Sequence, residues 1–189
     1  MNRRSALYVT FGIVVIAIAV ALFFARRTST VSTVATQTPP PVSAKIAVGK
    51  RAPEFQALTT HGFFDLNKTT MPVFLEVFAT WCPHCQRETT TINELYAAYK
   101  GKVAFVAVSG SDTGIDGQSP ENANDVLTFV QRFHVKYPVA YDGTMTVANL
   151  YLQGGFPTIV IIDRSRKITY VNSGEVPTDV LNAQLQRAL

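Results

Sequence analysis

The segment Val73–Ala79 constrains the fold of this 189-residue chain most strongly, because its residues are nearly all apolar. A run of this kind is typical of a central β-strand that other layers cover on both faces. The strand leads into Trp81–Cys85, which reads WCPHC, and Pro83–Tyr99 then carries apolar side chains at helical spacing. The sequence therefore predicts a buried strand, two cysteines where that strand ends, and a helix that begins between them.

The rest of the chain predicts further strands that alternate with helices. The other strands are expected at Glu54–Leu58, Gly62–Leu66, Val103–Val108, Tyr137–Tyr141, Thr158–Asp163 and Lys167–Ser173. The other helices are expected at Glu121–His134, around Val147–Tyr151 and at Thr178–Leu189. This order predicts an α/β sandwich with a mixed central sheet.

The N-terminal segment Ala6–Ala25 carries no charge and would rise about 30 Å as a helix, the thickness of a bilayer core. A cleaved signal peptide is the alternative, but its apolar region is shorter, about 7–15 residues. We therefore predict a single transmembrane anchor at 1–27, a tether rich in Ser, Thr and Pro at 28–45, and a folded domain at 46–189.

The net charge of +4 belongs to the N-terminal part of the chain. Five of the 17 basic residues precede Ile46, where no acidic residue occurs, which leaves 12 basic against 13 acidic residues in the folded domain. A domain with this balance has no basic surface for nucleic acid. The arginines on the two sides of the anchor nearly balance, so the positive-inside rule does not decide its orientation. We expect an extracytoplasmic domain, because a disulfide persists more readily there.

Cys82 and Cys85 are the only cysteines of the chain. A structural zinc ion needs four ligands, and there is no second cysteine pair to complete a site. A permanent disulfide across so short a loop would stabilise the fold little. Thiol–disulfide exchange is the leading hypothesis, because the N-terminus of a helix stabilises a thiolate at Cys82.

From about residue 49 onward, the chain resembles thioredoxin-fold proteins, specifically the membrane-tethered TlpA/ResA-like thiol–disulfide oxidoreductases. Four segments in order carry the resemblance: Ala52–Phe55, Phe78–Cys85, Tyr137–Val139 and Gly155–Thr158. The resemblance implies a thioredoxin-like three-layer sandwich and a redox-active Cys82–Cys85 disulfide with no other cofactor or metal. It also implies protein thiols or disulfides as partners, and a membrane protein as electron donor or acceptor.

The resemblance also implies roles for the residues at the site. Cys82 would be the exposed nucleophile, and Cys85 would be the shielded thiol that resolves the mixed disulfide. Pro157 would follow a cis peptide bond opposite the cysteines. Partner proteins would meet the surface formed by Trp81, Pro83, Phe156 and Pro157.

Three ionisable residues are expected to assist the cysteines. Glu76 interrupts the apolar strand; it is predicted to lie buried and to take the proton from Cys85, although a solvent-facing position is the alternative. Glu88 follows Cys85 by one turn; the resemblance implies that it tunes the cysteine pair, and the alternative is that it merely offsets the helix dipole. His84 would favour a thiolate at Cys82.

Two resemblances bear on the direction of electron flow, and they point in opposite directions. The tether and the overall pattern resemble extracytoplasmic reductants, including those that serve cytochrome c maturation. The Pro83-His84 dipeptide instead resembles the oxidase DsbA, and the dipeptide between the cysteines influences the reduction potential strongly. We expect a reductase; the alternatives are an oxidase of secreted proteins and a non-catalytic copper-binding module.

Overall fold

The computed structural model describes residues 46–189, so the predicted anchor and tether lie outside the described residues. The strands are β1 (Gln56–Thr59), β2 (Gly62–Asp65), β3 (Val73–Phe78), β4 (Ala104–Ser109), β5 (Val139–Tyr141), β6 (Thr158–Ile162) and β7 (Ile168–Ser173). The helices are α2 (Pro83–Tyr99), α3 (Ala123–Arg132), α4 (Thr146–Tyr151) and α5 (Thr178–Ala188). Within this part of the chain, no helix is both long and apolar enough to cross a membrane.

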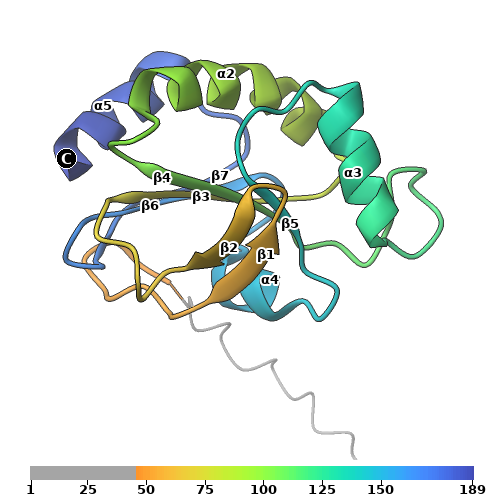
Figure 1. Cartoon of the computed structure of the whole chain (residues 1–189), viewed down its shortest axis with the longest axis horizontal. Helices are drawn as coiled ribbons and strands as arrows, with labels where there is room; N and C mark the ends of the chain where they lie inside the picture. The colour runs from red at the N-terminus through yellow and green to blue at the C-terminus, as the bar shows by residue number, and fades with distance from the viewer. Residues whose placement is uncertain (1–45) are drawn as a thin grey trace, which may run out of the picture. The chain divides into compact units, whose positions relative to one another are not determined.

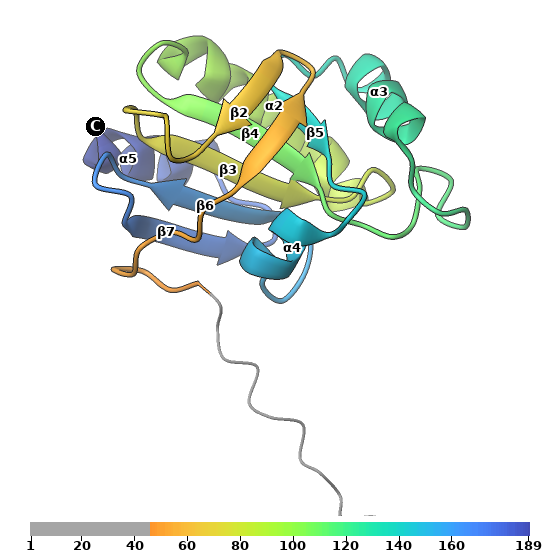
Figure 2. The ribbon, with the colours of Figure 1, turned by 60° about the horizontal axis from the view of Figure 1, so that its bottom comes forward.

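The strands form one sheet in the order β2-β1-β5-β4-β3-β6-β7. Strands β3, β4 and β5 run parallel, whereas β6 pairs antiparallel with both β3 and β7, and β1 pairs antiparallel with β2 and β5. Helices α2, α3 and α5 cover one face of the sheet and α4 covers the other, as Figures 1 and 2 show from two directions. The predicted three-layer α/β sandwich with a mixed sheet is therefore confirmed.

Strand β3 places the key acidic residue on a defined face of the sheet. All six of its residues are buried, which confirms the prediction of a strand covered on both sides. Because side chains alternate along a strand, Glu76 shares a face with Phe74 and Phe78, which pack in the core beneath α2. Glu76 therefore points toward the layer that carries the cysteines.

Most element boundaries agree with the sequence predictions, and α2 begins and ends where it was expected. The predicted helix at 121–134 begins later, at Ala123, because the side chains of Asn122 and Asp125 form a capping box there. The predicted strand at 137–141 is shorter, since β5 begins after Pro138, which has no N–H to donate to a neighbouring strand.

Candidate active site

Cys82 is the N-cap residue of α2, a few residues beyond the end of β3 at Phe78. Its N–H donates to the carbonyl oxygen of Ala79 at 3.1 Å, and its sulfur accepts a hydrogen bond from the N–H of Cys85 at 3.3 Å. Pro83 occupies the first helical turn, where its missing N–H is no loss. The local sequence thus places both sulfur atoms at the N-terminal end of one helix.

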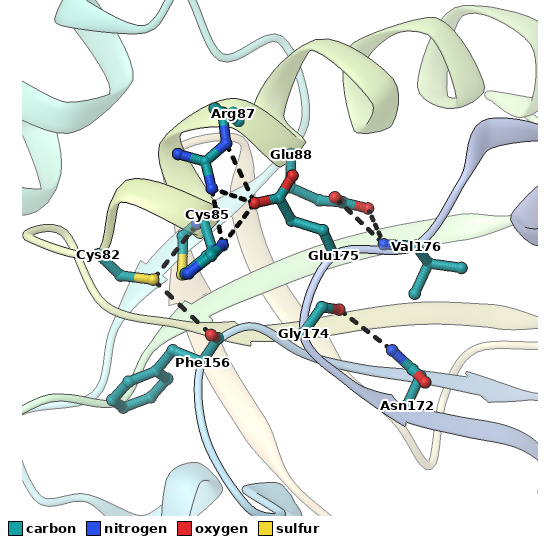
Figure 3. Close-up of polar contacts among 10 residues, drawn as sticks. Cys82, Cys85, Arg87, Glu88, Phe156, Asn172, Gly174, Glu175 and Val176 are labelled. Carbon is teal, nitrogen blue, oxygen red and sulfur yellow. Dashed lines mark hydrogen bonds and ion pairs between the residues drawn. The ribbon is translucent and has the colours of Figure 1, made fainter.

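Both cysteines are thiols in this structure, and both are buried. Cys82 is only 3% exposed, so the expectation of an exposed nucleophile is wrong for this conformation. The segment before β6 approaches Cys82, whose sulfur lies 3.7 Å from the carbonyl oxygen of Phe156 and can donate to it (Figure 3). The Phe156–Pro157 peptide bond is cis, as the resemblance implied.

An aromatic pair lies beside the cysteines at the surface. The rings of Trp81 and Phe156 meet edge to face, with centroids 6.1 Å apart, and the Trp81 indole N–H donates to Ser111 Oγ at 2.9 Å. Trp81 is 39% exposed and Pro83 is also exposed. The predicted partner-binding residues therefore adjoin Cys82 in the chain or in space: Trp81, Pro83, Phe156 and Pro157. Their contact with a partner protein stays a prediction.

Glu76 lies in the interior, with 2% exposure, so the solvent-facing alternative is wrong. The Tyr137 hydroxyl donates to Oε2 at 3.5 Å, whereas Oε1 accepts no hydrogen bond from the described residues. Burial above all, and also the charge of Glu88, raises the pKa of Glu76 to about 8, although Tyr137 lowers it. This carboxyl group can therefore hold and release a proton near neutral pH.

The negative charge of this carboxyl group acts on the Cys85 thiol. Burial raises the pKa of Cys85 well above its usual value, and the charge of Glu76 raises it further. A thiolate and a carboxylate together in this interior are strongly unfavourable, but a proton passed from Cys85 to Glu76 leaves only one charge. The transfer of a proton from Cys85 to Glu76 during resolution stays a prediction.

Glu88 is a second buried carboxylate, with 3% exposure. It lies beyond the first turn of α2, which contains no acidic residue, so the interpretation as a dipole-offsetting group is wrong. Both of its oxygens lie 3.4 Å from the N–H of Val176 (Figure 3). Burial raises the pKa of Glu88 to about 7; Glu175 contributes in the same direction, and the Val176 N–H opposes it.

His84 pairs with a residue that no sequence pattern had singled out. Its Nδ1 lies 2.5 Å from Glu175 Oε1 and 2.7 Å from Arg87 Nη2. Arg87 also donates to Glu175 from Nε, at 3.1 Å, and from Nη2. Arg87 could have been found at helical spacing from His84, but Glu175 lies 91 residues away. The predicted effect of His84 on Cys82 therefore has to be considered together with Arg87 and Glu175.

A third buried carboxylate, Glu121, was also missed. It accepts hydrogen bonds from Thr80 Oγ1 at 2.8 Å and from Ser109 Oγ at 2.7 Å, and so joins the segment after β3 to the end of β4. Its place in the chain, where a helix was expected to begin, gave no sign of its burial. Among residues 46–189, no three His, Cys, Asp or Glu side chains are grouped so that they could hold a metal ion.

Comparisons with known proteins agree with this arrangement. The Redoxin family model matches residues 47–189. The thiol-disulfide oxidoreductase ResA of a Bacillus cereus strain is 32% identical over 148 residues, which cover 76% of this chain and 79% of the relative.

Two solved structures share the fold. One is from Chlorobium tepidum and is assigned as a thiol:disulfide interchange protein DsbE; it is 27% identical, with a TM-score of 0.65, and covers 76% of this chain and 98% of its own. The thioredoxin domain of a thiol-disulfide oxidoreductase from Bacteroides vulgatus is 20% identical, with a TM-score of 0.61, over 76% of this chain and 99% of its own. With its thioredoxin-like fold, the chain belongs to the Redoxin family and is a thiol–disulfide oxidoreductase related to ResA.

Proposed function

We propose that this protein is a membrane-tethered reductase that donates electrons to protein disulfides outside the cytoplasm, and that it serves cytochrome c maturation. Cys82 and Cys85 would carry the electrons, and a membrane protein would reduce them again after each turnover. The uncharged segment Ala6–Ala25 supports the tether, and the ResA-type relatives support the chemistry.

The proposed reaction has two exchange steps. The Cys82 sulfur attacks the partner's disulfide, forms a mixed disulfide, and releases one partner sulfur, which takes a proton. Cys85 then passes its proton to Glu76 and attacks the Cys82 sulfur, which breaks the mixed disulfide and closes the Cys82–Cys85 disulfide. The second partner sulfur leaves and takes a proton, and Glu76 releases the proton that it accepted from Cys85. The partner thus gains two electrons and two protons, both from the dithiol.

One observation carries the proposed direction: the dithiol is buried, and so are two carboxyl groups on the elements that it joins, Glu76 on β3 and Glu88 on α2. Burial and negative charge both disfavour a thiolate, as the raised pKa of Cys85 indicates. DsbA, a strongly oxidising thiol–disulfide protein, owes its high reduction potential to a stabilised reduced form. An environment that does not stabilise a thiolate lacks this contribution, which supports a potential below that of such an oxidant.

A second candidate function, an oxidase of secreted proteins, is favoured by the Pro83-His84 dipeptide at the start of α2. A protonated His84 beside Cys82 would stabilise the reduced form and raise the potential. His84 Nδ1, however, lies against the Glu175 carboxylate, which offsets a positive charge on the ring. We therefore rank the oxidase below the reductase.

The reduction potential of the purified full-length chain distinguishes the two functions. We expect equilibrium with glutathione to give a value nearer to about −270 mV, as in thioredoxin, than to about −120 mV, as in DsbA. The reduced protein should also reduce an oxidised peptide with the C-x-x-C-H haem-attachment sequence. A potential near that of DsbA would favour the oxidase instead.

The location is tested in intact cells with a thiol reagent that does not cross membranes, after mild reduction. We expect Cys82 of the full-length chain to be labelled, and a Cys82→Ser variant to lose that label. Labelling that occurs only after lysis would place the domain in the cytoplasm and would contradict both extracytoplasmic functions.

A further inference from the structure

The segment Gly174–Val176, between β7 and α5, lies against the active site at three consecutive residues (Figure 3). The N–H of Gly174 donates to the carbonyl oxygen of Pro157 at 2.8 Å, next to the cis peptide bond. The N–H of Val176 lies 3.4 Å from both oxygens of Glu88. Backbone contacts on both sides thus hold the residue between them, Glu175, at a fixed place beside the first turns of α2.

The Glu175 carboxylate faces the two basic side chains that precede and follow Cys85. One of its oxygens accepts from Arg87 and lies 2.5 Å from His84 Nδ1. Both partners lower the pKa of Glu175, so this group is ionised at neutral pH. Glu175 raises the pKa of Arg87, and Arg87 lies at the start of the same helix that Cys82 caps (Figure 3).

We propose that Glu175 is a positioning residue that holds His84 and Arg87, withholds the positive charge of the Arg87 guanidinium from the Cys82 sulfur, and so makes the dithiol a stronger electron donor. The role acts through the two basic residues, and Glu175 itself takes no part in bond making. The proposal rests on the proposed function, because it assumes that Cys82 is the attacking thiol.

The direction in which Glu175 changes the reduction potential follows from the electrostatics of the thiolate. Positive charge near sulfur stabilises the thiolate and therefore the reduced form, which raises the reduction potential. A carboxylate that neutralises this charge lowers the potential. The effect is moderate in size, because the side chains of His84 and Arg87 are more than half exposed and water screens them.

The test is Glu175→Gln in the full-length chain, which keeps the shape of the side chain and removes its charge. We expect the equilibrium with glutathione to shift about three- to tenfold toward the dithiol, a rise of roughly 15–30 mV. We also expect a larger thiolate fraction of Cys82 at neutral pH, measured from the pH profile of alkylation in a Cys85→Ser background. The control is Asp179→Asn, which removes an exposed carboxylate from the start of α5.

A second comparison tests whether Glu175 changes the reduction potential through His84 and Arg87. Glu175→Gln is repeated in a His84→Ala/Arg87→Gln background, where the potential should change by less than half as much as in the wild-type background. A potential that does not differ between Glu175→Gln and the Asp179→Asn control would overturn the proposal. So would a full effect in the background without His84 and Arg87. If Cys82→Ser kept its activity, the failure would instead lie in the proposed function.

Discussion

Cys82 and Cys85 lie on the same turn of α2, yet the charged groups around them differ in their access to water. Beside Cys82, the side chains of His84, Arg87 and Glu175 are 62%, 57% and 37% exposed. Beneath Cys85, by contrast, the ionisable groups are buried: Glu76, Glu88 and Tyr137. Water and salt screen the first group, whereas the second acts through an interior of low dielectric.

From this difference we expect a different kind of control at each step of the proposed reaction. Groups near Cys82 should adjust how readily the first thiol attacks, by small amounts that depend on ionic strength. Groups near Cys85 decide whether the second thiol can lose its proton at all, because burial keeps its pKa high. Substitutions on the buried side should therefore have the larger effects.

The largest effect should come from the cysteines themselves. Cys82→Ser removes the attacking sulfur and should abolish reduction of a disulfide substrate. Cys85→Ser removes only the resolving sulfur, so the mixed disulfide with the partner should accumulate, and mass spectrometry detects it. Full activity of Cys82→Ser, or a stable adduct on Cys85 of that variant, would reverse the two assignments.

Glu76→Gln should make the fold more stable at high pH. The pKa of Glu76 is about 8 in the folded chain against 4.5 for an unperturbed glutamate, so the folded state binds the proton more tightly than the unfolded state. The stability linked to this proton is fully present below pH 4.5 and is lost as the pH rises through about 8. Denaturant unfolding should therefore show the variant gaining roughly 2–4 kcal/mol over the wild type between about pH 5 and about pH 8.

The control for this stability measurement is Glu94→Gln, which changes an exposed carboxylate of α2. Its stability relative to the wild type should stay nearly constant over the same pH range. An equal pH dependence in the wild type and Glu76→Gln would show that Glu76 does not hold its proton in the folded state.

His84→Ala should have the smallest effect, and it tests the exposed side of the comparison. Loss of the ring removes one of the two groups that neutralise Glu175, so the Cys82 thiolate should be less favoured and the reduction potential should fall. We expect less than about a threefold change in the redox equilibrium, diminishing as salt is added, because Arg87 remains. An effect larger than that of any buried substitution would contradict the comparison.

The buried side of the site could be predicted from the sequence better than the exposed side. A carboxylate within the apolar strand Val73–Ala79 has few ways to reach water, so the burial of Glu76 could be predicted from the neighbouring residues. The bounds of α2 could be predicted too, since Cys82 caps the helix, Pro83 begins it and the apolar spacing continues to Tyr99. In each case the determining residues are near in the sequence.

The exposed side depends on contacts between distant segments. Phe156, whose carbonyl oxygen lies beside the Cys82 sulfur, is 74 residues away, so the burial of Cys82 could not be predicted from the WCPHC segment. Glu175 meets Arg87 across 88 residues, and an isolated glutamate in a loop gives no sign of its partners. The predicted anchor and tether lie outside the described residues and stay predictions.

The most direct test of the proposed proton transfer is the pH dependence of resolution in Glu76→Gln, followed by stopped flow with Ellman's reagent. The first release of thionitrobenzoate reports attack by Cys82, and the second reports resolution by Cys85. In the wild type, the second rate should rise with pH until Glu76 is ionised, near its pKa of about 8. In Glu76→Gln this rate should fall about tenfold or more at neutral pH, while the first rate changes less than about twofold.

Glu121→Gln is the matched control, because it removes another buried carboxylate near the end of β3 that has no part in the proposed proton transfer. It should leave the second rate and its pH profile close to those of the wild type. If Glu76→Gln slowed both releases equally, or left the pH profile of the second release unchanged, Glu76 would not be the proton acceptor for Cys85.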